Sequence, residues 1–322
     1  MRGSRCIGER RGPARPDGGA RTGDSRGARP DLAWQCAACP RCCGGPLLSL
    51  KPQHALSFDV EEYFHVANLR ERFPMETWEG VSSRLDVGMD RILETLKRHD
   101  ARATFFFLGW VAERRPDLVR RCHELGHEVA SHGYDHRFLW EVGRDGIEDH
   151  LARAEEAIMA AGAPRPVGFR ASTFTLTDET FWAMEALAAR GYLYDSSIHP
   201  VRHPVYGMPN FEPGISVVET PAGPVTEFPV ATFRCFGRNW PVGGGGYFRL
   251  LPGRLHRAAL ARLGRPGALY LHPWEFDPEQ PRVPAPLMKA WRHYLNLDRS
   301  QPRLEKLLAT FRFGTMREVL GV

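Results

Sequence analysis

The chain has 322 residues and a formal net charge of +5, with 43% hydrophobic and 25% charged residues. This composition is ordinary for a globular protein, and the length allows one large α/β domain or two small ones. The charge is uneven, because residues 1–50 hold nine Arg and four acidic residues, while basic and acidic residues balance in the remainder. The basic character therefore belongs to the N-terminal segment and gives no reason to expect a nucleic-acid partner.

Residues 1–50 are rich in Arg, Gly and Pro and show no hydrophobic period, so we expect a disordered segment. Its closely spaced cysteines superficially resemble zinc ligands, but no second ligand pair follows, and a chance cluster is the preferred interpretation. No apolar run reaches the roughly 18 residues that span a bilayer, so no transmembrane segment is expected. No apolar segment adjoins the Arg-rich start as in a signal peptide, so we expect a cytoplasmic or membrane-peripheral protein.

From residue 54 onward, short apolar runs alternate with amphipathic stretches. Strands are expected at 54–58, 103–108, 128–131, 167–170, 192–195, 225–228 and 268–271. Helices are expected at 88–98, 117–125, 144–161, 178–189 and 253–263, and again at 285–297 and 301–311, followed by a final turn at 316–320. The alternation predicts a parallel sheet covered by helices, either a closed barrel or a doubly wound sheet. Residues 198–247, rich in Pro and Gly, are expected to be a long insertion.

Carboxylates follow the first expected strand, as Asp59, Glu61 and Glu62. In a parallel barrel, reactive groups collect where strands end and loops begin. Paired carboxylates at such a position can divide the work, one binding a metal while the other takes a proton from water. The alternative is a helix-capping acid followed by solvated charges.

Two histidines, His132 and His136, follow the third expected strand. Residues four apart project to the same side if the turn that carries them is helical. Paired imidazoles at this spacing bind zinc and similar divalent ions. The spacing alone is a weak signal, but its place at a strand end, opposite the acidic residues, strengthens the prediction.

Three further polar residues end expected strands, namely Arg170, Asp195 and His272. An arginine that leaves an apolar strand needs an anionic partner, which the nearby carboxylates can supply. A histidine at a strand end can donate a proton at neutral pH, although a single histidine is more often structural.

The segment 126–136, Gly-His-Glu-Val-Ala-Ser-His-Gly-Tyr-Asp-His, resembles the histidine motif of the polysaccharide deacetylases with a NodB homology domain, the family-four carbohydrate esterases. The segments 57–59, 169–170, 195–197 and 271–272 resemble the other motifs of this family, in the same order. The resemblance covers residues 54–277. It implies a distorted (β/α) barrel of the NodB type over residues 51–280, followed by a helical extension, residues 281–322, that packs on the barrel.

This resemblance implies metal-dependent removal of N-acetyl groups from an amino-sugar polysaccharide or its precursor. A divalent ion, expected to be zinc, would be bound by His132, His136 and a glutamate. The family usually has two adjacent aspartates, but Val60 takes the second place here. Glu61 is therefore expected to be the third ligand, with Glu62 as the alternative.

The resemblance also implies the proton-transfer groups. Asp59, fixed by Arg170, would remove a proton from water, and His272, oriented by Asp195, would protonate the departing amine. Segments such as 59–64 and 272–277 resemble a bacterial subfamily from exopolysaccharide loci that accompany PEP-CTERM/exosortase systems, which implies exopolysaccharide biosynthesis machinery as a partner.

Two other functions stay open at this point. One is an allantoinase-like amidohydrolase that acts on a small ureide or imide, and the other is a non-catalytic carbohydrate-binding relative. The glycine run 243–246 is either a close approach of backbone to a sugar or a flexible link. Trp240, Trp274 and Tyr247 are candidates for stacking on sugar rings, although packing is the commoner role of such residues.

Overall fold

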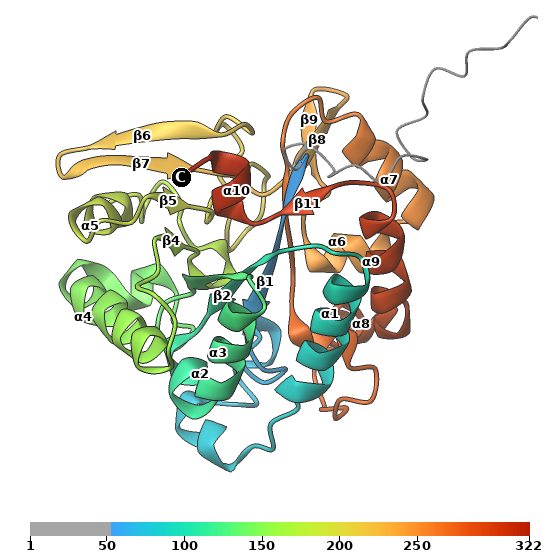
Figure 1. The fold of residues 1–322 in the computed structure, drawn as a ribbon, viewed down its shortest axis with the longest axis horizontal. Helices are drawn as coiled ribbons and strands as arrows, with labels where there is room; N and C mark the ends of the chain where they lie inside the picture. Colours follow the sequence, from blue (N-terminus) through green and yellow to red (C-terminus); the bar gives the residue numbers. More distant parts are fainter. Residues whose placement is uncertain (1–52) are drawn as a thin grey trace, which may run out of the picture. The chain divides into compact units, whose positions relative to one another are not determined.

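A computed structural model describes residues 53–322 of the chain (Figure 1). The expected disordered segment 1–50 and its cysteines lie outside the described residues. The main sheet has the order β10-β1-β2-β3-β4-β5-β7-β6, and β11 pairs with β1 beside this path. Its strands are β1 (His54–Val60), β2 (Thr104–Phe107), β3 (Glu128–Ser131), β4 (Gly168–Phe169), β5 (Tyr194–Asp195), β6 (Ser216–Thr220), β7 (Gly223–Glu227), β10 (Ala268–Leu271) and β11 (Phe313–Gly314).

A separate hairpin is formed by β8 (Thr232–Cys235) and β9 (Arg238–Pro241). Helices α1 to α5 lie outside the strands of the main sheet (Figure 1). The α-helices are α1 (Leu85–Arg98), α2 (Gly109–Arg114), α3 (Pro116–Glu124), α4 (Leu139–Ala160), α5 (Ala183–Ala189), α6 (Gly245–Leu250), α7 (Gly253–Ala261), α8 (Leu287–Tyr294), α9 (Ser300–Leu308) and α10 (Met316–Leu320). The 3-10 helices are η1 (Ala67–Leu69), η2 (Met75–Gly80), η3 (Ser172–Phe174), η4 (Pro273–Phe276) and η5 (Leu297–Arg299).

The sheet closes into a barrel through a short contact between β10 and the segment that follows β7. The pairs from β10 through β1 to β7 are all parallel, and only the edge strand β6 runs antiparallel. Just after β7, Val230 forms an isolated parallel bridge with Ala268 of β10. The N–H of Ala231 donates to the carbonyl of Ala268 at 2.9 Å. The expected distorted α/β barrel is therefore confirmed.

The strand β1 shows why the barrel forms, because all seven of its residues are buried. Leu56, Phe58 and Val60 belong to the apolar core that also includes residues of α1, outside the barrel. Ala55 belongs to a second cluster with residues of β2, β3, β5 and β10, inside the barrel. A strand covered on both faces reads as a nearly continuous apolar run, which is the pattern by which β1 was predicted.

The helix α10 closes the amino-terminal end of the barrel. Met316 packs in the interior cluster, and its N–H donates to Oγ1 of Thr104 at 2.8 Å. The N–H of Arg317 donates to Oε2 of Glu128 at 3.2 Å. Thr104 and Glu128 are the first residues of β2 and β3, so the carboxyl ends of the strands form the opposite, open rim.

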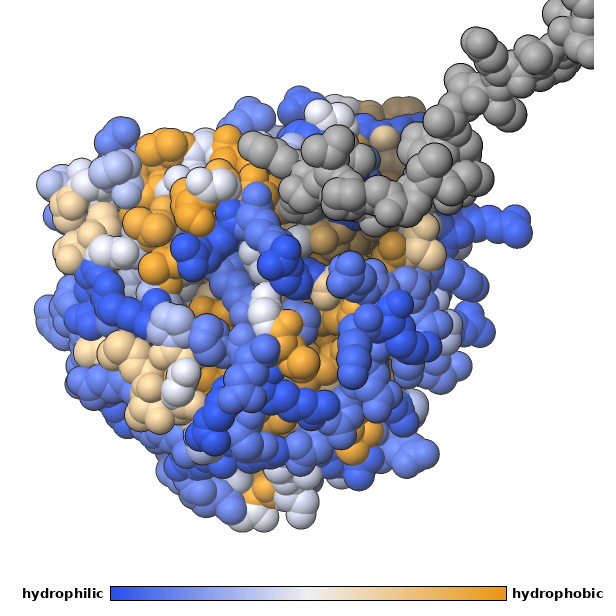
Figure 2. All heavy atoms as spheres, viewed as in Figure 1, coloured by the Kyte–Doolittle hydropathy of each residue, from blue (hydrophilic) through white to orange (hydrophobic). Residues whose placement is uncertain are grey.

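Two expectations about the chain were incomplete. The expected insertion 198–247 contains the β6 strand and the β8–β9 hairpin as well as loops, and the end of the chain adds a strand, β11, to its expected helices. Most of the face shown in Figure 2 is hydrophilic, with apolar residues gathered around the β6–β7 hairpin, where Val217 is 59% exposed. No helix within residues 53–322 combines the length and the apolar character that crossing a membrane requires.

Helix α1 packs against η4 with almost no space at one glycine. A Cβ atom added at Gly88 would lie 2.0 Å from the carbonyl oxygen of Pro273, whereas one at Gly146 in α4 would make an ordinary contact of 3.7 Å with Cγ1 of Val142. Gly88→Ala should therefore lower the free energy of unfolding by about 1–3 kcal/mol. Gly146→Ala should leave it unchanged or raise it by up to ~1 kcal/mol, as expected for an open helix position. Urea denaturation of both variants measures the difference, and equal stabilities would show that α1 and η4 do not pack as described.

Candidate active site

The register of the parallel strands brings polar side chains together at the open rim. Phe58 of β1 pairs with Leu271 of β10, so the next residues along the two strands, Asp59 and His272, lie side by side. In the same way, β3 and β4 run parallel, and the residues that follow them, His132 and Arg170, come into contact. Residues that are far apart in the sequence therefore share one buried site.

Glu61, His132 and His136 form a cluster that could hold a metal ion. One ligand atom from each residue lies within 4.8 Å of the other two. The three residues are between 2% and 9% exposed. Among residues 53–322, this is the one group of three or more His, Cys, Asp or Glu residues with such spacing. A carboxylate with two imidazoles is a donor set that zinc and similar divalent ions favour.

The state of the donor atoms fits a divalent cation. Nδ1–H of His132 donates to the carbonyl of Arg170 at 2.8 Å, which leaves the Nε2 lone pair free for a metal. Burial lowers the pKa of His132 to about 4, so the ring is neutral. Oε2 of Glu61 lies 2.7 Å from Nε2 of His136, yet it has no hydrogen-bond partner. Burial raises the pKa of Glu61, but the nearby His136 outweighs burial and lowers it, so the carboxylate is charged.

The two histidines converge without a helical turn, contrary to the expectation from their spacing. The segment between β3 and α4 is a loop in which His136 has a φ of 57° and Gly133 a φ of 74°. The ring centroids of His132 and His136 nevertheless lie 5.6 Å apart. A Cβ atom at Gly133 would lie 2.3 Å from Nε2 of His150, which accepts the N–H of Tyr134 at 3.2 Å. Glycine is thus required by both the backbone angle and the tight packing.

Glu62, the alternative ligand, points away from the histidines. Its carboxylate accepts hydrogen bonds from Oγ of Ser83 and from the N–H of Arg84, the latter at 3.2 Å. Burial raises the pKa of Glu62. The geometry therefore favours Glu61 over Glu62 as the carboxylate of the cluster.

Asp59 and Arg170 form an ion pair that is almost fully buried, with side-chain exposures of 2% and 0%. Nη1 of Arg170 donates to Oδ1 of Asp59 at 2.6 Å and to Oγ of Ser57 at 2.8 Å. Nε and Nη2 donate to the carbonyl and the hydroxyl of Ser196 at 3.0 and 2.9 Å. The anionic partner expected for Arg170 is therefore Asp59, whose second oxygen, Oδ2, lies 3.9 Å from Nε2 of His272.

His272 is surrounded by carboxylates. Its Nε2 lies 3.6 Å from Oε1 of Glu61, and its Nδ1 lies 3.7 Å from Oε1 of Glu275. Burial would lower the pKa of His272, but Glu275, Glu61 and Asp59 together outweigh burial and raise the pKa to about 9. The imidazole therefore carries a proton at neutral pH. A cation bound by Glu61 would offset one of these carboxylates and lower the pKa again.

The expected contact between Asp195 and His272 is not found. Asp195 accepts hydrogen bonds from the N–H and the hydroxyl of Ser197, at 3.0 and 2.6 Å. No oxygen of Asp195 lies within 4.0 Å of a nitrogen of His272, whereas Glu275 does. The sequence prediction was wrong because β5 and β10 are not neighbours in the sheet, so their ends do not meet.

Glu275 is held by Arg249, a residue that sequence reasoning missed. Nε of Arg249 donates to Oε1 of Glu275 at 3.1 Å, and both side chains are 2% exposed or less. Its Nη1 donates to the carbonyls of His293 and Leu295, at 2.9 and 2.7 Å, and its Nη2 donates to that of Arg292. A buried arginine thus fixes the carboxylate behind His272 to the end of α8. In the sequence, the spacing of three residues between His272 and Glu275 is the signal that could have indicated their contact.

The glycine run and the tryptophan after His272 both serve packing. A Cβ at Gly244 or Gly245 would lie 2.6 Å from Oη of Tyr270 or 2.2 Å from Oε1 of Glu275, so the run lets α6 approach β10. The run was expected to be either a close approach of backbone to a sugar or a flexible link, and this packing contact is neither. Trp274 is 8% exposed, and its Nε1–H donates to Oε1 of Glu61 at 3.2 Å. Trp274 therefore supports the cluster and has no free face for a sugar.

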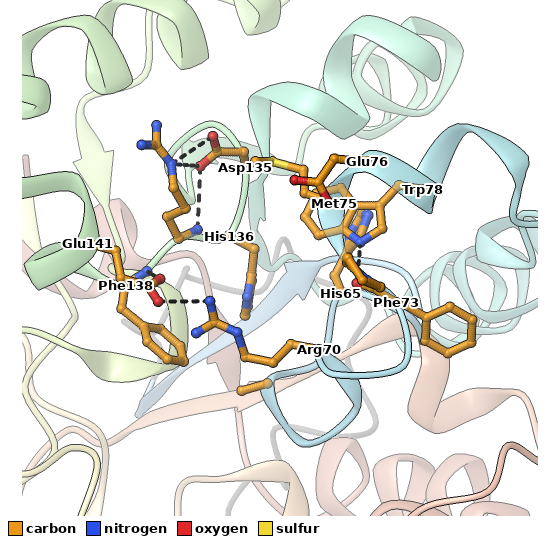
Figure 3. Close-up of a pocket in the computed structure, with 13 residues that line it drawn as sticks. His65, Arg70, Phe73, Met75, Glu76, Trp78, Asp135, His136, Phe138 and Glu141 are labelled. Atoms are coloured by element: carbon orange, nitrogen blue, oxygen red, sulfur yellow. Dashed lines mark hydrogen bonds and ion pairs between the residues drawn. The ribbon is translucent and has the colours of Figure 1, made fainter.

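A cavity of about 400 Å³ opens beside His136 (Figure 3). Its floor is polar, because Arg70 pairs with Glu141 at 2.8 Å and Arg137 pairs with Asp135 at 2.9 Å. The remaining wall comes from the segment that contains η1 and η2. It is lined by His65, Ala67, Arg70, Phe73, Pro74, Met75, Glu76, Trp78, Asp135, His136, Arg137, Phe138 and Glu141. One residue of the candidate metal cluster, His136, thus lines a cavity that a small polar ligand can enter.

A His/His/Glu cluster beside a carboxylate–histidine pair, at the rim of an α/β barrel, is an arrangement that metal-assisted hydrolysis can use. Residues 81–192 match the family described as polysaccharide deacetylase, and residues 196–321 match a family described as a domain of unknown function, DUF3473. The chain therefore carries a polysaccharide deacetylase domain joined to DUF3473. His132, His136 and Arg170 lie in the first segment, and His272 lies in the second.

Relatives with assigned activities match the chain over a limited length. A peptidoglycan-N-acetylglucosamine deacetylase of Listeria monocytogenes is 35% identical over 92 residues, which are 29% of this chain and 19% of that protein. One from Bacillus cereus is 38% identical over 77 residues, 23% of this chain and 28% of that protein. A chitooligosaccharide deacetylase of Sinorhizobium fredii is 41% identical over 70 residues, 22% of this chain and 33% of that protein. The chain thus spans a third or less of these relatives.

The fold is shared over a longer range. A crystal structure from Mycobacterium smegmatis, of a protein assigned as a polysaccharide deacetylase, superposes with a TM-score of 0.55 and 20% sequence identity. The match covers 82% of this chain and 90% of that one. The similarity confirms the barrel fold, including the half of the chain that lies beyond the deacetylase segment.

The Glu61, His132 and His136 cluster predicts metal binding by the purified protein. His136→Ala removes one ligand, so we expect affinity for zinc to fall at least about tenfold. His123→Ala, at an exposed position on α3, should bind zinc like the wild type. Calorimetric titration and elemental analysis measure the effect. If His136→Ala keeps wild-type affinity, the cluster is not the metal site.

The buried carboxyl group of Glu227 predicts that the free energy of unfolding depends on pH. Glu227 pairs with Asp195 in the β5–β7 ladder, and its Oε1 accepts the N–H of Ile198 at 3.1 Å. Burial and the Asp195 carboxylate raise the pKa of Glu227 well above its ordinary value of 4.5. The folded protein therefore keeps a proton that the unfolded chain loses above pH 4.5, so this group lowers stability as the pH rises through that window.

Glu227→Gln cannot lose this proton. As the pH is raised from about 5 to 8, the free energy of unfolding of the wild type should therefore fall relative to that of the variant, by at most about 1.4 kcal/mol per pH unit. Urea denaturation at several pH values gives the two curves. Glu219→Gln, at an exposed position on β6, should follow the wild type. Parallel curves for Glu227→Gln and the wild type would mean that Glu227 is ionised in the folded protein.

Proposed function

We propose that this protein is a metal-dependent deacetylase that removes N-acetyl groups from an amino-sugar polysaccharide or its precursor. The observation that carries the proposal is the meeting of a His/His/Glu cluster, an Asp–Arg pair and His272 at one barrel rim. The match of residues 81–192 to the polysaccharide deacetylase family supports the same reaction. The assigned activities of the short-range relatives, on peptidoglycan and on chitooligosaccharides, support an acetylated glycan as the substrate.

We assign the metal-binding role to Glu61, His132 and His136, with zinc as the expected ion. A divalent ion bound there would polarise the attacking water and the acetamide carbonyl. The side chains around the cluster exclude bulk water, because Trp274 and Arg170 hold the ligands Glu61 and His132 in a buried layer. Burial strengthens the electrostatic interactions on which such a reaction depends.

Asp59 and His272 would move the protons. Asp59 is held on Oδ1 by Arg170, and its Oδ2 is free to accept a proton from water as the water attacks the carbonyl carbon. His272 lies on the same side of the site and, when protonated, would give its proton to the nitrogen of the sugar as the carbon–nitrogen bond breaks. Acetate and a free amino sugar are the products. Asp195 would then support Ser197 and the loop after β5 instead of orienting His272.

We propose that the segment 281–322 and the barrel segment 51–280 act as one catalytic unit. The contacts of Arg249 with α8 connect the two segments and support this proposal. The ion pair of Arg98 with Glu305, at 2.6 Å, connects them again, between α1 and α9. The expected localisation and the expected link to exopolysaccharide biosynthesis stay predictions.

Acetate release from N-acetylglucosamine oligomers tests the proposal. The zinc-loaded wild type should release acetate, and Asp59→Asn should lower the turnover about 100-fold or more, because the proton acceptor is lost. The zinc content of Asp59→Asn should match that of the wild type. Asp145→Asn, at an exposed position on α4, is the control and should keep full activity.

Two outcomes would contradict the proposal. The first is an Asp59→Asn variant that deacetylates as fast as the wild type. The second is a zinc-loaded wild type that releases no acetate from any acetylated oligomer but hydrolyses a small ureide such as allantoin.

A further inference from the structure

A second cavity, of about 730 Å³, lies at the same rim as the candidate active site and has no role in the proposed reaction. It shares Phe138 with the first cavity, which contains His136. Its walls come from the loops that follow β3, β4 and β5. It is lined by Phe138, Trp140, Thr177, Asp178, Glu179, His203, Pro204, Val205, Tyr206 and Gly207. Its volume is in the range of about 300–1,000 Å³ that is usual for ligand sites.

Flat aromatic rings form two sides of this cavity. Trp140 is 44% exposed, and its ring lies 4.9 Å from that of Phe138. His203 and Tyr206 stack with their ring centroids 3.7 Å apart and an angle of 14° between the planes. Tyr206 also stacks on the buried His199, which fixes its orientation from behind. Rigid, partly exposed rings of this kind suit the apolar faces of sugar rings.

Two carboxylate groups lie on the wall of this cavity. Asp178 and Glu179 are exposed, and neither has an ion-pair partner within 4.0 Å among residues 53–322. Burial lowers the pKa of His203 to about 4, with a smaller effect of Arg292, so this ring is neutral at pH 7. In the first cavity, by contrast, the carboxylates of Asp135 and Glu141 are each paired with an arginine.

We propose that the second cavity binds an amino-sugar unit whose acetyl group has already been removed. This inference rests on the proposed deacetylase function. Removal of the acetyl group leaves an amine that is protonated in neutral or mildly acidic solution, and an ammonium group is the partner that two unpaired carboxylates favour. An acetylated unit would stack on the same rings but would gain nothing from Asp178 and Glu179.

Such a subsite would bias the protein toward glycans that are partly deacetylated. Phe138 lines both cavities, and in this proposal one glycan would lie across it, with the processed unit in the second cavity and an acetylated unit near His136. The product of one reaction would then help to hold the same glycan for the next. The products would then contain runs of adjacent free amino sugars more often than isolated ones.

Calorimetric titration of the full chain with a glucosamine tetramer and with an N-acetylglucosamine tetramer tests this inference. The double variant Asp178→Asn/Glu179→Gln should bind the glucosamine tetramer about tenfold more weakly, and it should bind the acetylated tetramer within about twofold of the wild type. The control Asp145→Asn/Glu156→Gln removes the same charge from exposed positions on α4 and should bind both like the wild type. Trp140→Ala should weaken the binding of both tetramers, because the stacking face is lost.

Unchanged affinity of the Asp178→Asn/Glu179→Gln variant for the glucosamine tetramer would overturn the inference. Equal loss of affinity for the two tetramers would also overturn it, because the carboxylates would then not recognise the amine. Binding needs no turnover, so the outcome is independent of acetate release. If the wild type binds the glucosamine tetramer through Asp178 and Glu179 but releases no acetate, the binding site stands and the proposed function fails.

Discussion

A guanidinium group with no exposed surface is the constraint around which the open end of this barrel is organised. Arg170 cannot lose its charge, so its burial requires an anion and a partner for nearly every N–H. Asp59 supplies the charge, while Ser57 and Ser196 accept the remaining hydrogen bonds. The carbonyl of Arg170 also orients His132. One residue at the end of β4 thus fixes the aspartate of β1 and a histidine of the loop after β3.

The same arrangement shows how the two matched segments depend on each other. The deacetylase segment 81–192 contributes the histidines of the cluster and Arg170, but it contains neither Asp59 nor Glu61, which precede it. The DUF3473 segment contributes β7, β10 and β11 to the same sheet, together with His272, Glu275 and Arg249. It therefore completes the barrel wall, and the residues around the candidate proton donor come from it. A boundary at residue 196 describes sequence similarity and does not separate two folded units.

Much of this could be predicted from the sequence. The strands at 128–131 and 268–271 were predicted with their observed bounds, because apolar runs buried on both faces have sharp ends. The cluster of Glu61 with His132 and His136 was also anticipated, since strand ends of a parallel barrel meet at one rim. The helical turn assumed for the two histidines was wrong, because Gly133 and His136 have positive φ in a loop that long-range contacts, such as the one with His150, stabilise.

Other features depend on contacts that no local pattern encodes. Asp195 was placed beside His272 because both end strands, but adjacency in the sheet decides which ends meet. Arg249 contacts Glu275, 26 positions further along the chain, because a glycine run lets α6 approach β10 closely. The pairing of Glu227 with Asp195 depends on the register of β5 and β7, two short strands whose register the sequence leaves open.

The chain leaves the barrel just before β8 and returns to it just after β9, at almost the same place. The carbonyl of Ala231, just before β8, accepts the N–H groups of Val242 and Gly243, just after β9, at 3.1 and 2.9 Å. The ten residues between these positions form a closed excursion whose outermost side chain, Phe236, is 95% exposed. Changes of length or composition at the tip of this excursion should have little effect on the neighbouring strands, because hydrogen bonds close the excursion at its base. Divergence among related chains can therefore accumulate there at little cost to the barrel, and a foreign peptide grafted at its tip would leave the rim where it is.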